Sequence, residues 1–239
     1  MSRILLGGAC MAALLSVAVA AHADPAADAK FKALYSREWA WRAAQFDIDE
    51  DAKAIHDHLP KVDPATQSQR LAYWAEVSKE LDAIPPASLS AENQINYAVY
   101  RAQIGSQLNE QKFREYEKPL NADTTFWTEL SAAARKHLES EHDYRNYIAW
   151  LRDFPRYFHD QEANMRAGLA RGFTPPKATL TGRDASISMV SEAKSPQDSL
   201  FYEPFKTMPS SIPAEVQAQL RADGAKAIAE AVTPTYGEL

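Results

Sequence analysis

Apolar residues along most of the chain recur every three or four positions, the spacing that places them on one face of an α-helix. Alternating strand patterns are hard to find, and glycine is rare, at eight residues. The sequence therefore predicts an all-α fold, a multi-helix array. The predicted helices cover about residues 30–58, 63–84, 90–115, 125–140, 142–172, 186–192 and 213–239.

Aspartate, proline and glycine mark several of the predicted boundaries. Asp63 is placed to cap a helix whose first residue is Pro64, where the missing N–H costs nothing. Pro155 is expected to kink or restart the helix that contains it, and Gly172 to end that helix. The proline-rich stretch 174–213 reads as a loop around one short helix.

The predicted helix 90–115 has two apolar faces. One face carries Tyr97, Tyr100, Ile104 and Leu108, and the adjoining one carries Ile95, Val99 and Ala102. A helix of this kind is usually sandwiched between others, so we expect neighbours on both faces.

The last predicted helix is still in phase when the sequence reaches Leu239. No glycine cap or polar tail follows the last apolar positions. The pattern predicts that residues 24–239 form the N-terminal helical part of a longer, truncated fold.

Residues 1–23 have the three-part pattern of a secretory signal peptide. Arg3 precedes the apolar run Ile4–Ala21, and Ala21-His22-Ala23 forms an A-x-A cleavage site. A run of this length could also span a bilayer, but its many small residues weaken insertion. We expect cleavage after Ala23, no membrane segment in the mature chain, and a periplasmic or secreted location.

Cys10, the single cysteine, lies inside the apolar run, and Gly7-Gly8-Ala9 is a poor lead-in to a lipidation site. Cleavage would therefore leave a chain without thiol, disulfide or cysteine metal ligand. Loss of Arg3 changes the formal charge from −6 to −7, with no long block of one sign. An acidic chain does not attract phosphate backbones, so nucleic acid is not an expected partner.

The histidines of the mature chain do not fit a zinc-hydrolase helix, which needs two of them four residues apart. His137 and His142 are five apart and would point about 140° away from each other on a helix. We interpret them as a solvated helix end, His56 and His58 as a polar helix terminus, and His159 as a hydrogen-bonding group at the edge of the core.

Other catalytic signatures are also missing from the sequence. It has no G-x-S-x-G elbow and no phosphate-binding glycine loop. The acidic groups at Glu139 and Glu141 and at residues 47–51 read as water-facing surface, the second group holding a cation loosely at most. The tryptophans are expected mainly in the core, with some free to line a substrate groove; they are Trp39, Trp41, Trp74, Trp127 and Trp150.

One stretch, YIAWLRDFPRYFHDQEANMRAGLARGFTPP at residues 147–176, resembles the N-terminal half of the bacterial family called domain of unknown function 885. YSREWAWRAAQFD at 35–47 and LDAIPPASLSAENQINYAVYRAQI at 81–104 fit the same family, and so do SPQDSLFYEPF and the helix ending in TPTYGEL. The resemblance covers nearly all of the mature chain.

The resemblance implies a large helical protein similar to zinc-dependent peptidases, with a His-Glu-x-x-Pro-Gly-His motif downstream of residue 239. No catalytic residue, metal ligand or zinc is then expected in this chain, which would be inactive alone. Its helices would wall a groove for a peptide substrate, with Tyr157, Asn164, Arg166 and Arg171 as candidate lining residues. For Arg166 the alternative is an ordinary surface pair with Glu162, four residues earlier.

A second hypothesis stays open beside this one. The chain could be a stand-alone exported helical module that uses its aromatic surface to hold a peptide or another protein.

Overall fold

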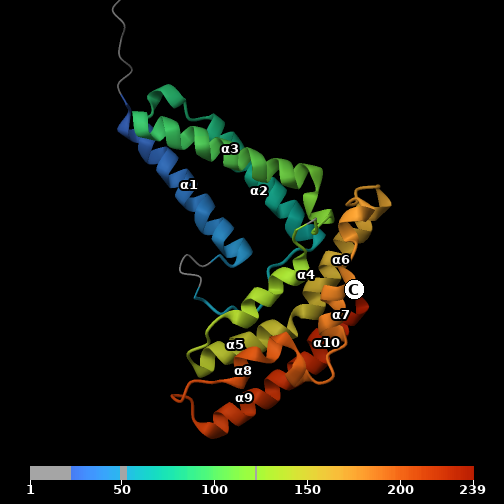
Figure 1. Cartoon of the computed structure of the whole chain (residues 1–239). Helices are drawn as coiled ribbons and strands as arrows, with labels where there is room; N and C mark the ends of the chain where they lie inside the picture. The colour runs from blue at the N-terminus through green and yellow to red at the C-terminus, as the bar shows by residue number, and fades with distance from the viewer. Residues whose placement is uncertain (1–22, 49–52, 122) are drawn as a thin grey trace, which may run out of the picture.

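The structure is a computed structural model that describes residues 23–48, 53–121 and 123–239. This part of the chain is an array of helices without a named strand, as the apolar spacing predicts, and has one isolated bridge between Leu120 and Thr125. Figure 1 shows the long N-terminal helices at one end and a second, larger group of helices packed beside them. The predicted signal peptide lies outside the described residues, apart from the exposed Ala23.

The first group contains three long helices and two short 3₁₀ turns. They are α1 (Pro25–Phe46), α2 (Pro64–Asp82), the turn Pro86–Ser88, α3 (Ala91–Phe113) and the turn Glu115–Glu117.

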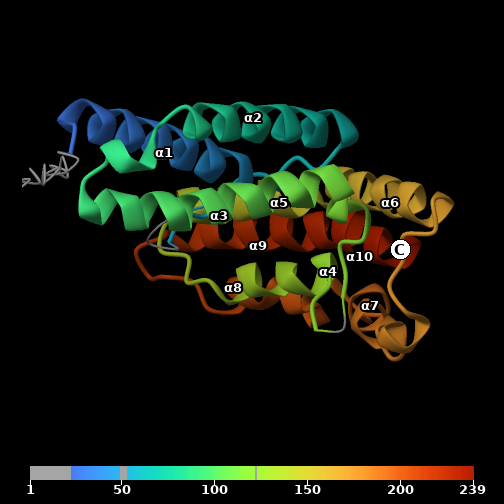
Figure 2. The same ribbon diagram turned by 90° about the horizontal axis from the view of Figure 1, so that it is seen from above.

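The second group contains the remaining helices. They are α4 (Phe126–Glu129), the 3₁₀ helix Leu130–Arg135, α5 (Glu141–Arg152), α6 (Phe154–Ala170), the turn Lys177–Leu180, α7 (Asp184–Ser191), the turns Pro196–Asp198 and Leu200–Tyr202, α8 (Glu203–Lys206), α9 (Ala214–Ala227), the π-helix Ile228–Val232 and α10 (Thr233–Glu238). Figure 2 shows α9 and α10 running along one line.

Capping residues set several of the boundaries predicted from sequence. The Asp63 carboxylate accepts hydrogen bonds from the backbone N–H groups of Ala65 and Thr66, with Pro64 as the first helical residue. Pro155 lies in the first turn of α6, so the chain restarts there. Gly172 follows α6 with a φ of +75°, which glycine adopts without steric cost.

Three predicted boundaries are wrong. α1 ends at Phe46 and not near His58, because Asp47 adopts the left-handed conformation and the N–H of Ile48 closes the last turn on Ala43. The predicted helix 125–140 is one turn of α-helix followed by 3₁₀ helix and a loop. The predicted loop 174–213 contains several short helical turns besides α7.

Two hydrophobic cores hold the groups together. The first lies between α1, α2 and α3 and is built around Phe31, Trp74 and Ile104. The second lies inside the larger group, where the rings of Phe154 and Phe158 stack with centroids 5.8 Å apart. Both cores contain side chains that are completely buried, so each group of helices has a close-packed interior of its own.

A buried carboxylate crosses the first core. Glu38 of α1 accepts hydrogen bonds from the indole N–H of Trp74 at 3.1 Å and the hydroxyl of Tyr100 at 3.3 Å. Arg42 neutralises it, with its Nε 3.1 Å from Oε1. Burial, together with the charge of Glu38, raises the pKa of Tyr100, so its hydroxyl remains a donor. One side chain therefore ties all three helices together.

The predicted second contact face of α3 is not covered by another described element. Tyr97, Tyr100 and Ile104 are buried, but Ile95 and Val99 are 68 % and 66 % exposed. The expectation of a sandwiched helix is therefore wrong for the described chain, because α1 and α2 both pack against the first face and its edge.

Among the described helices, none is long and apolar enough to cross a membrane.

The two faces of α3 should respond differently to truncation. Ile104→Ala removes a side chain from the first core and is expected to lower the free energy of unfolding by about 2–5 kcal/mol. Ile95→Ala on the exposed face is expected to stay within about 0.5 kcal/mol. Urea unfolding followed by circular dichroism measures both, and equal losses would contradict the burial difference.

Two glycines in helices make a second comparison. At Gly224 of α9 an added Cβ would overlap the ring of Phe205, whereas at Gly105 of α3 nothing lies within 4 Å. Gly224→Ala is expected to cost about 1–3 kcal/mol, and Gly105→Ala to stabilise by about 0.5–1 kcal/mol through helix propensity. Thermal melts of the two variants should shift in opposite directions; a shift in the same direction would refute the close packing of α9 on α8.

Candidate functional site

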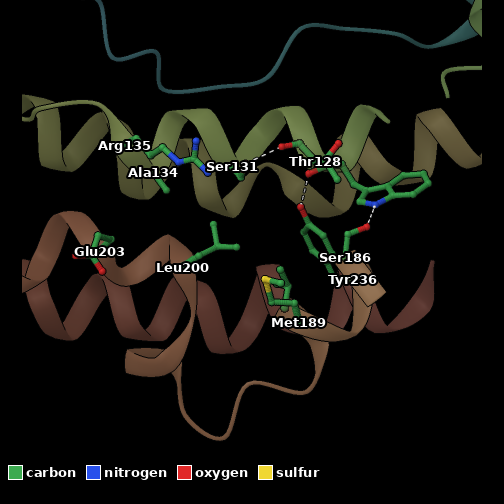
Figure 3. A pocket seen from close by; sticks show the side chains of 11 residues that line it. Thr128, Ser131, Ala134, Arg135, Ser186, Met189, Leu200, Glu203 and Tyr236 are labelled. Carbon is green, nitrogen blue, oxygen red and sulfur yellow. Dashed lines mark hydrogen bonds between the residues drawn. The ribbon is translucent and has the colours of Figure 1, made fainter. Parts of the chain in front are cut away.

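A cleft of about 270 Å³ lies in the second group of helices, and we name it the Trp127 cleft. α4 and the 3₁₀ helix Leu130–Arg135 form one side, and α7 and the turn Leu200–Tyr202 lie opposite (Figure 3). Tyr236 of α10 contributes to the lining between them. The lining residues are Trp127, Thr128, Ser131, Ala134, Arg135, Ser186, Met189, Val190, Leu200, Glu203 and Tyr236.

Hydrogen bonds between distant segments fix the walls of the cleft. The Tyr236 hydroxyl donates to the backbone carbonyl of Trp127 at 2.7 Å, and the Trp127 indole N–H donates to Ser186 Oγ at 2.9 Å (Figure 3). Burial raises the pKa of Tyr236, so its phenol keeps the proton that it donates. The cleft is therefore preformed.

The interior of the cleft is apolar and its lip is charged. Ala134, Val190 and Tyr236 are buried, whereas Arg135 and Glu203 are exposed on elements that face each other. Glu203 pairs with Lys206 at 2.7 Å. The arrangement suits an apolar group that enters the cleft with a polar group left at its edge.

The hydroxyls of the cleft are not arranged as nucleophiles. Ser131 Oγ donates to the carbonyl of Thr128 at 2.7 Å, and Ser186 Oγ donates to the carbonyl of Arg183 at 2.6 Å. Both hydroxyl protons are thus engaged with backbone carbonyls, and no histidine is among the described residues that line the cleft.

A second hollow, of about 350 Å³, lies between α1 and α3 and is more open to solvent. Its walls are mainly aromatic, and the charged Arg42 at this groove is already paired with Glu38. The groove adjoins the exposed face of α3. Its lining residues are Phe31, Tyr35, Trp39, Arg42, Asn96, Val99, Tyr100 and Gln103.

The four groove residues expected from sequence lie apart from the Trp127 cleft. Tyr157 is partly buried, with its ring edge-on to Phe126, and Asn164 is buried and donates to the backbone carbonyl of Val62 at 2.8 Å. Arg166 is exposed and pairs with Glu162 at 2.8 Å, the surface pair considered as its alternative.

Arg171, the fourth of these residues, binds the buried carboxylate of Glu117 and the carbonyl of Phe113. Its guanidinium also lies over the Phe173 ring, 4.1 Å from the centroid. These contacts join the end of α6 to the end of α3. A role of the four residues in binding substrate stays a prediction.

The tryptophans differ in burial, and the structure shows which of them line a hollow. Trp74, Trp127 and Trp150 are buried, and Trp41 stacks on Tyr73 with centroids 3.8 Å apart. Trp39 is partly exposed in the α1–α3 groove. Trp127 is a buried tryptophan that also lines a cleft, where its indole N–H donates to Ser186.

The histidines and acidic residues form no metal site in the described part of the chain, where no group of three His, Cys, Asp or Glu is placed to hold an ion. His137 lies in the loop before α5, and His142 lies in its first turn, where its ring nitrogen is 3.2 Å from the amide of Asn146. His159 is exposed, 3.8 Å from Asp160. Residues 49–51 of the acidic run lie outside the described residues.

His58 is the histidine with the clearest electrostatic environment. Its Nδ1 is 2.6 Å from Asp57 Oδ1, and its Nε2 is 3.5 Å from Asp47 Oδ1. The hydrogen bond with Asp57 is the main cause of a raised pKa for His58, and Asp47 adds to it. The contact between His58 and Asp47 connects the end of α1 to the segment that follows.

This pairing should make stability slightly dependent on pH. Because the folded-state pKa of His58 lies above its ordinary value of 6.5, its contribution is fully present below about pH 6.5 and is lost as the pH rises through the raised value. The imidazole is 57 % exposed, so the effect is small. We expect Asp57→Asn to lower the His58 pKa in an NMR titration of the Cε1–H signal. Glu76→Gln, on a separate surface pair with Lys79, should leave it unchanged; no shift with Asp57→Asn would contradict the contact.

Comparison with solved structures finds the same helical arrangement in a longer protein. The chain is similar to a crystal structure described as "the putative lipoprotein from Colwellia psychrerythraea", with a TM-score of 0.63 and 15 % sequence identity. The similarity covers 88 % of this chain and 39 % of that chain, so this chain spans about two fifths of the length of that relative. At this identity the likeness shows the fold.

No curated protein matches the chain. A family model described as "Bacterial protein of unknown function (DUF885)" matches residues 42–239, which include everything from the last turn of α1 to α10. That match covers most of the sequence and agrees with the motifs at 81–104 and 147–176. The chain therefore belongs to the bacterial DUF885 family.

Proposed function

We propose that this chain is an exported helical unit that holds a peptide in the Trp127 cleft, as the substrate-binding part of a peptidase-like hydrolase. The observation that carries the proposal is the preformed apolar cleft, whose walls are joined by the Tyr236–Trp127 and Trp127–Ser186 hydrogen bonds. Such a cleft does not need to be assembled by its ligand, which lowers the cost of binding.

The size of the cleft favours one side chain of an extended ligand. Sites that enclose a whole small molecule usually have volumes of about 300–1,000 Å³. The Trp127 cleft, at about 270 Å³, lies below this range and is partly open to solvent. A peptide that inserts one apolar side chain and leaves its backbone at the lip fits this shape.

The proposal gives the described residues a binding role and no bond-breaking step. The family resemblance implies zinc chemistry through a His-Glu-x-x-Pro-Gly-His motif, which residues 1–239 do not contain. The described residues do not assemble a set of ligands that fits zinc either.

Export of the chain is part of the proposal. The pattern of Arg3, the apolar run and the Ala21-His22-Ala23 site supports a signal peptide. The description of the Colwellia relative as a lipoprotein concerns that protein and is compatible with an exported family.

The second hypothesis, a stand-alone binding module, is favoured by one observation. Both hydrophobic cores have fully buried aromatic residues, such as Trp74 and Phe154, which are covered by the described chain itself. A chain with this packing is expected to unfold in one cooperative transition. A broad, non-cooperative thermal melt of the purified chain would count against the module.

Peptide binding can be tested through the intrinsic fluorescence of the tryptophans. Acetylated tetrapeptides that contain one Phe or Leu are expected to change the emission of Trp127, and all-glycine peptides are not. Met189→Lys places a charge at the mouth of the cleft, where the side chain is 69 % exposed, and should weaken binding about tenfold without loss of stability.

The matched control is Leu169→Lys, because Leu169 is 68 % exposed on α6 and does not line the cleft. It should bind the peptides as the unmodified chain does. Equal weakening in both variants, or no binding of any apolar peptide, would refute the proposed function.

A further inference from the structure

Among the donors that line the Trp127 cleft, most are already engaged with the protein itself. The indole of Trp127 donates to Ser186, the hydroxyl of Ser186 to Arg183, and that of Ser131 to Thr128. The Thr128 hydroxyl donates to the Thr125 carbonyl at 3.1 Å, and the Tyr236 hydroxyl donates to Trp127. These groups shape the cleft and have little capacity left to donate to a ligand.

Arg135 is different. It is exposed at the end of the 3₁₀ helix Leu130–Arg135 and lines the cleft, and in the described part of the chain it has neither an ion pair nor a side-chain hydrogen bond. Most other described arginines have one, for example Arg145 with Glu141 and Arg156 with Asp153. Glu203, across the cleft, is paired with Lys206 instead.

The lip of the cleft therefore carries an unneutralised guanidinium. Its five N–H donors form a planar fork that matches the two oxygens of a carboxylate. An anionic group held there would lie beside the apolar interior formed by Val190, Ala134 and the Trp127 ring.

We propose that the Trp127 cleft binds the C-terminal residue of a peptide, with the apolar side chain inside the cleft and the α-carboxylate on Arg135. The inference rests on the proposed function and specifies its ligand. A C-terminal residue carries both required groups on one Cα, so it can satisfy an apolar cleft and an adjacent cation together. A cleft of about 270 Å³ leaves room for one residue of this kind.

Two tetrapeptides of identical sequence ending in phenylalanine test the inference, one with a free C-terminal acid and one with a C-terminal amide. The acid is expected to bind about tenfold more tightly, because the charged hydrogen bonds to the guanidinium require the carboxylate. The difference should shrink as salt is raised, since Arg135 is exposed.

Variants assign the effect to one residue. Arg135→Gln should remove the preference for the acid while the amide binds as before, and Arg135→Lys should retain part of the preference because the charge remains. Arg152→Gln is the matched control: Arg152 is exposed on α5, does not line the cleft, and likewise has no ion pair among the described residues. It should keep the full preference.

The outcomes separate this inference from the proposed function. Equal affinity of the acid and the amide for the unmodified chain would overturn the inference and leave peptide binding intact. A preference for the acid that survives in Arg135→Gln would also overturn it, and so would equal binding of an amidated peptide with an internal aspartate beside the phenylalanine. Absence of binding by either peptide would overturn both proposals. A thermal melt of Arg135→Gln equal to that of the unmodified chain shows that its fold is retained.

Discussion

A non-helical segment between α1 and α2 packs against the second group of helices, and its backbone needs hydrogen-bond partners outside itself. Residues 53–62 have no regular secondary structure, so their N–H and C=O groups must be satisfied by other elements. Asp153 accepts from the N–H of Leu59 at 2.8 Å, and Arg156 donates to the carbonyl of Leu59 at 2.7 Å. Asn164 donates to the carbonyl of Val62, and Arg70 donates to the carbonyl of Lys61. Side chains from both groups thus converge on one stretch of backbone and fix the position of one core relative to the other.

Two of the candidate groove residues make structural contacts of this kind. The family resemblance makes Asn164 a candidate for lining a groove. Its partner, the carbonyl of Val62, lies 102 residues earlier, and no local pattern reveals that pairing. Arg171 is similar, because its partner Glu117 precedes it by 54 residues.

Local signals predicted most of the helices, and non-local packing decided the rest. The Asp63 cap, the proline that restarts the chain at α6 and the left-handed Gly172 act within a few residues, so the sequence identifies them. The early end of α1 depends on the left-handed conformation of Asp47, which aspartate adopts only occasionally. The apolar spacing beyond Asp47 did not indicate this end. The exposed face of α3 shows the same limit, because periodicity records which positions are apolar and not whether another element covers them.

The Trp127 cleft could not be predicted from local sequence patterns, because its walls come from distant parts of the chain. Its walls join Trp127, Ser186 and Tyr236, and the Tyr236–Trp127 hydrogen bond spans 109 positions. The sequence identified the tryptophans as a group from which a groove could be built, but the partner of an indole N–H is set by the fold. Nothing in the sequence singled out Arg135. It differs from other surface arginines only because the other donors around the cleft are hydrogen-bonded within the protein.

The π-helix between α9 and α10 has a consequence for how the chain tolerates changes in length. Within it the N–H of Thr233 donates to the carbonyl of Ile228, five residues back, so the wide turn accommodates one residue more than an α-helical turn would. Each residue of an α-helix advances the side-chain direction by about 100°. Loss of a single residue within the π-helix would remove that extra residue and leave an ordinary α-helical turn, so the Tyr236 phenol would keep its direction toward the Trp127 carbonyl. A one-residue deletion is therefore expected to harm the cleft less within the π-helix than in α10 before Tyr236, where it would turn that side chain by about 100°.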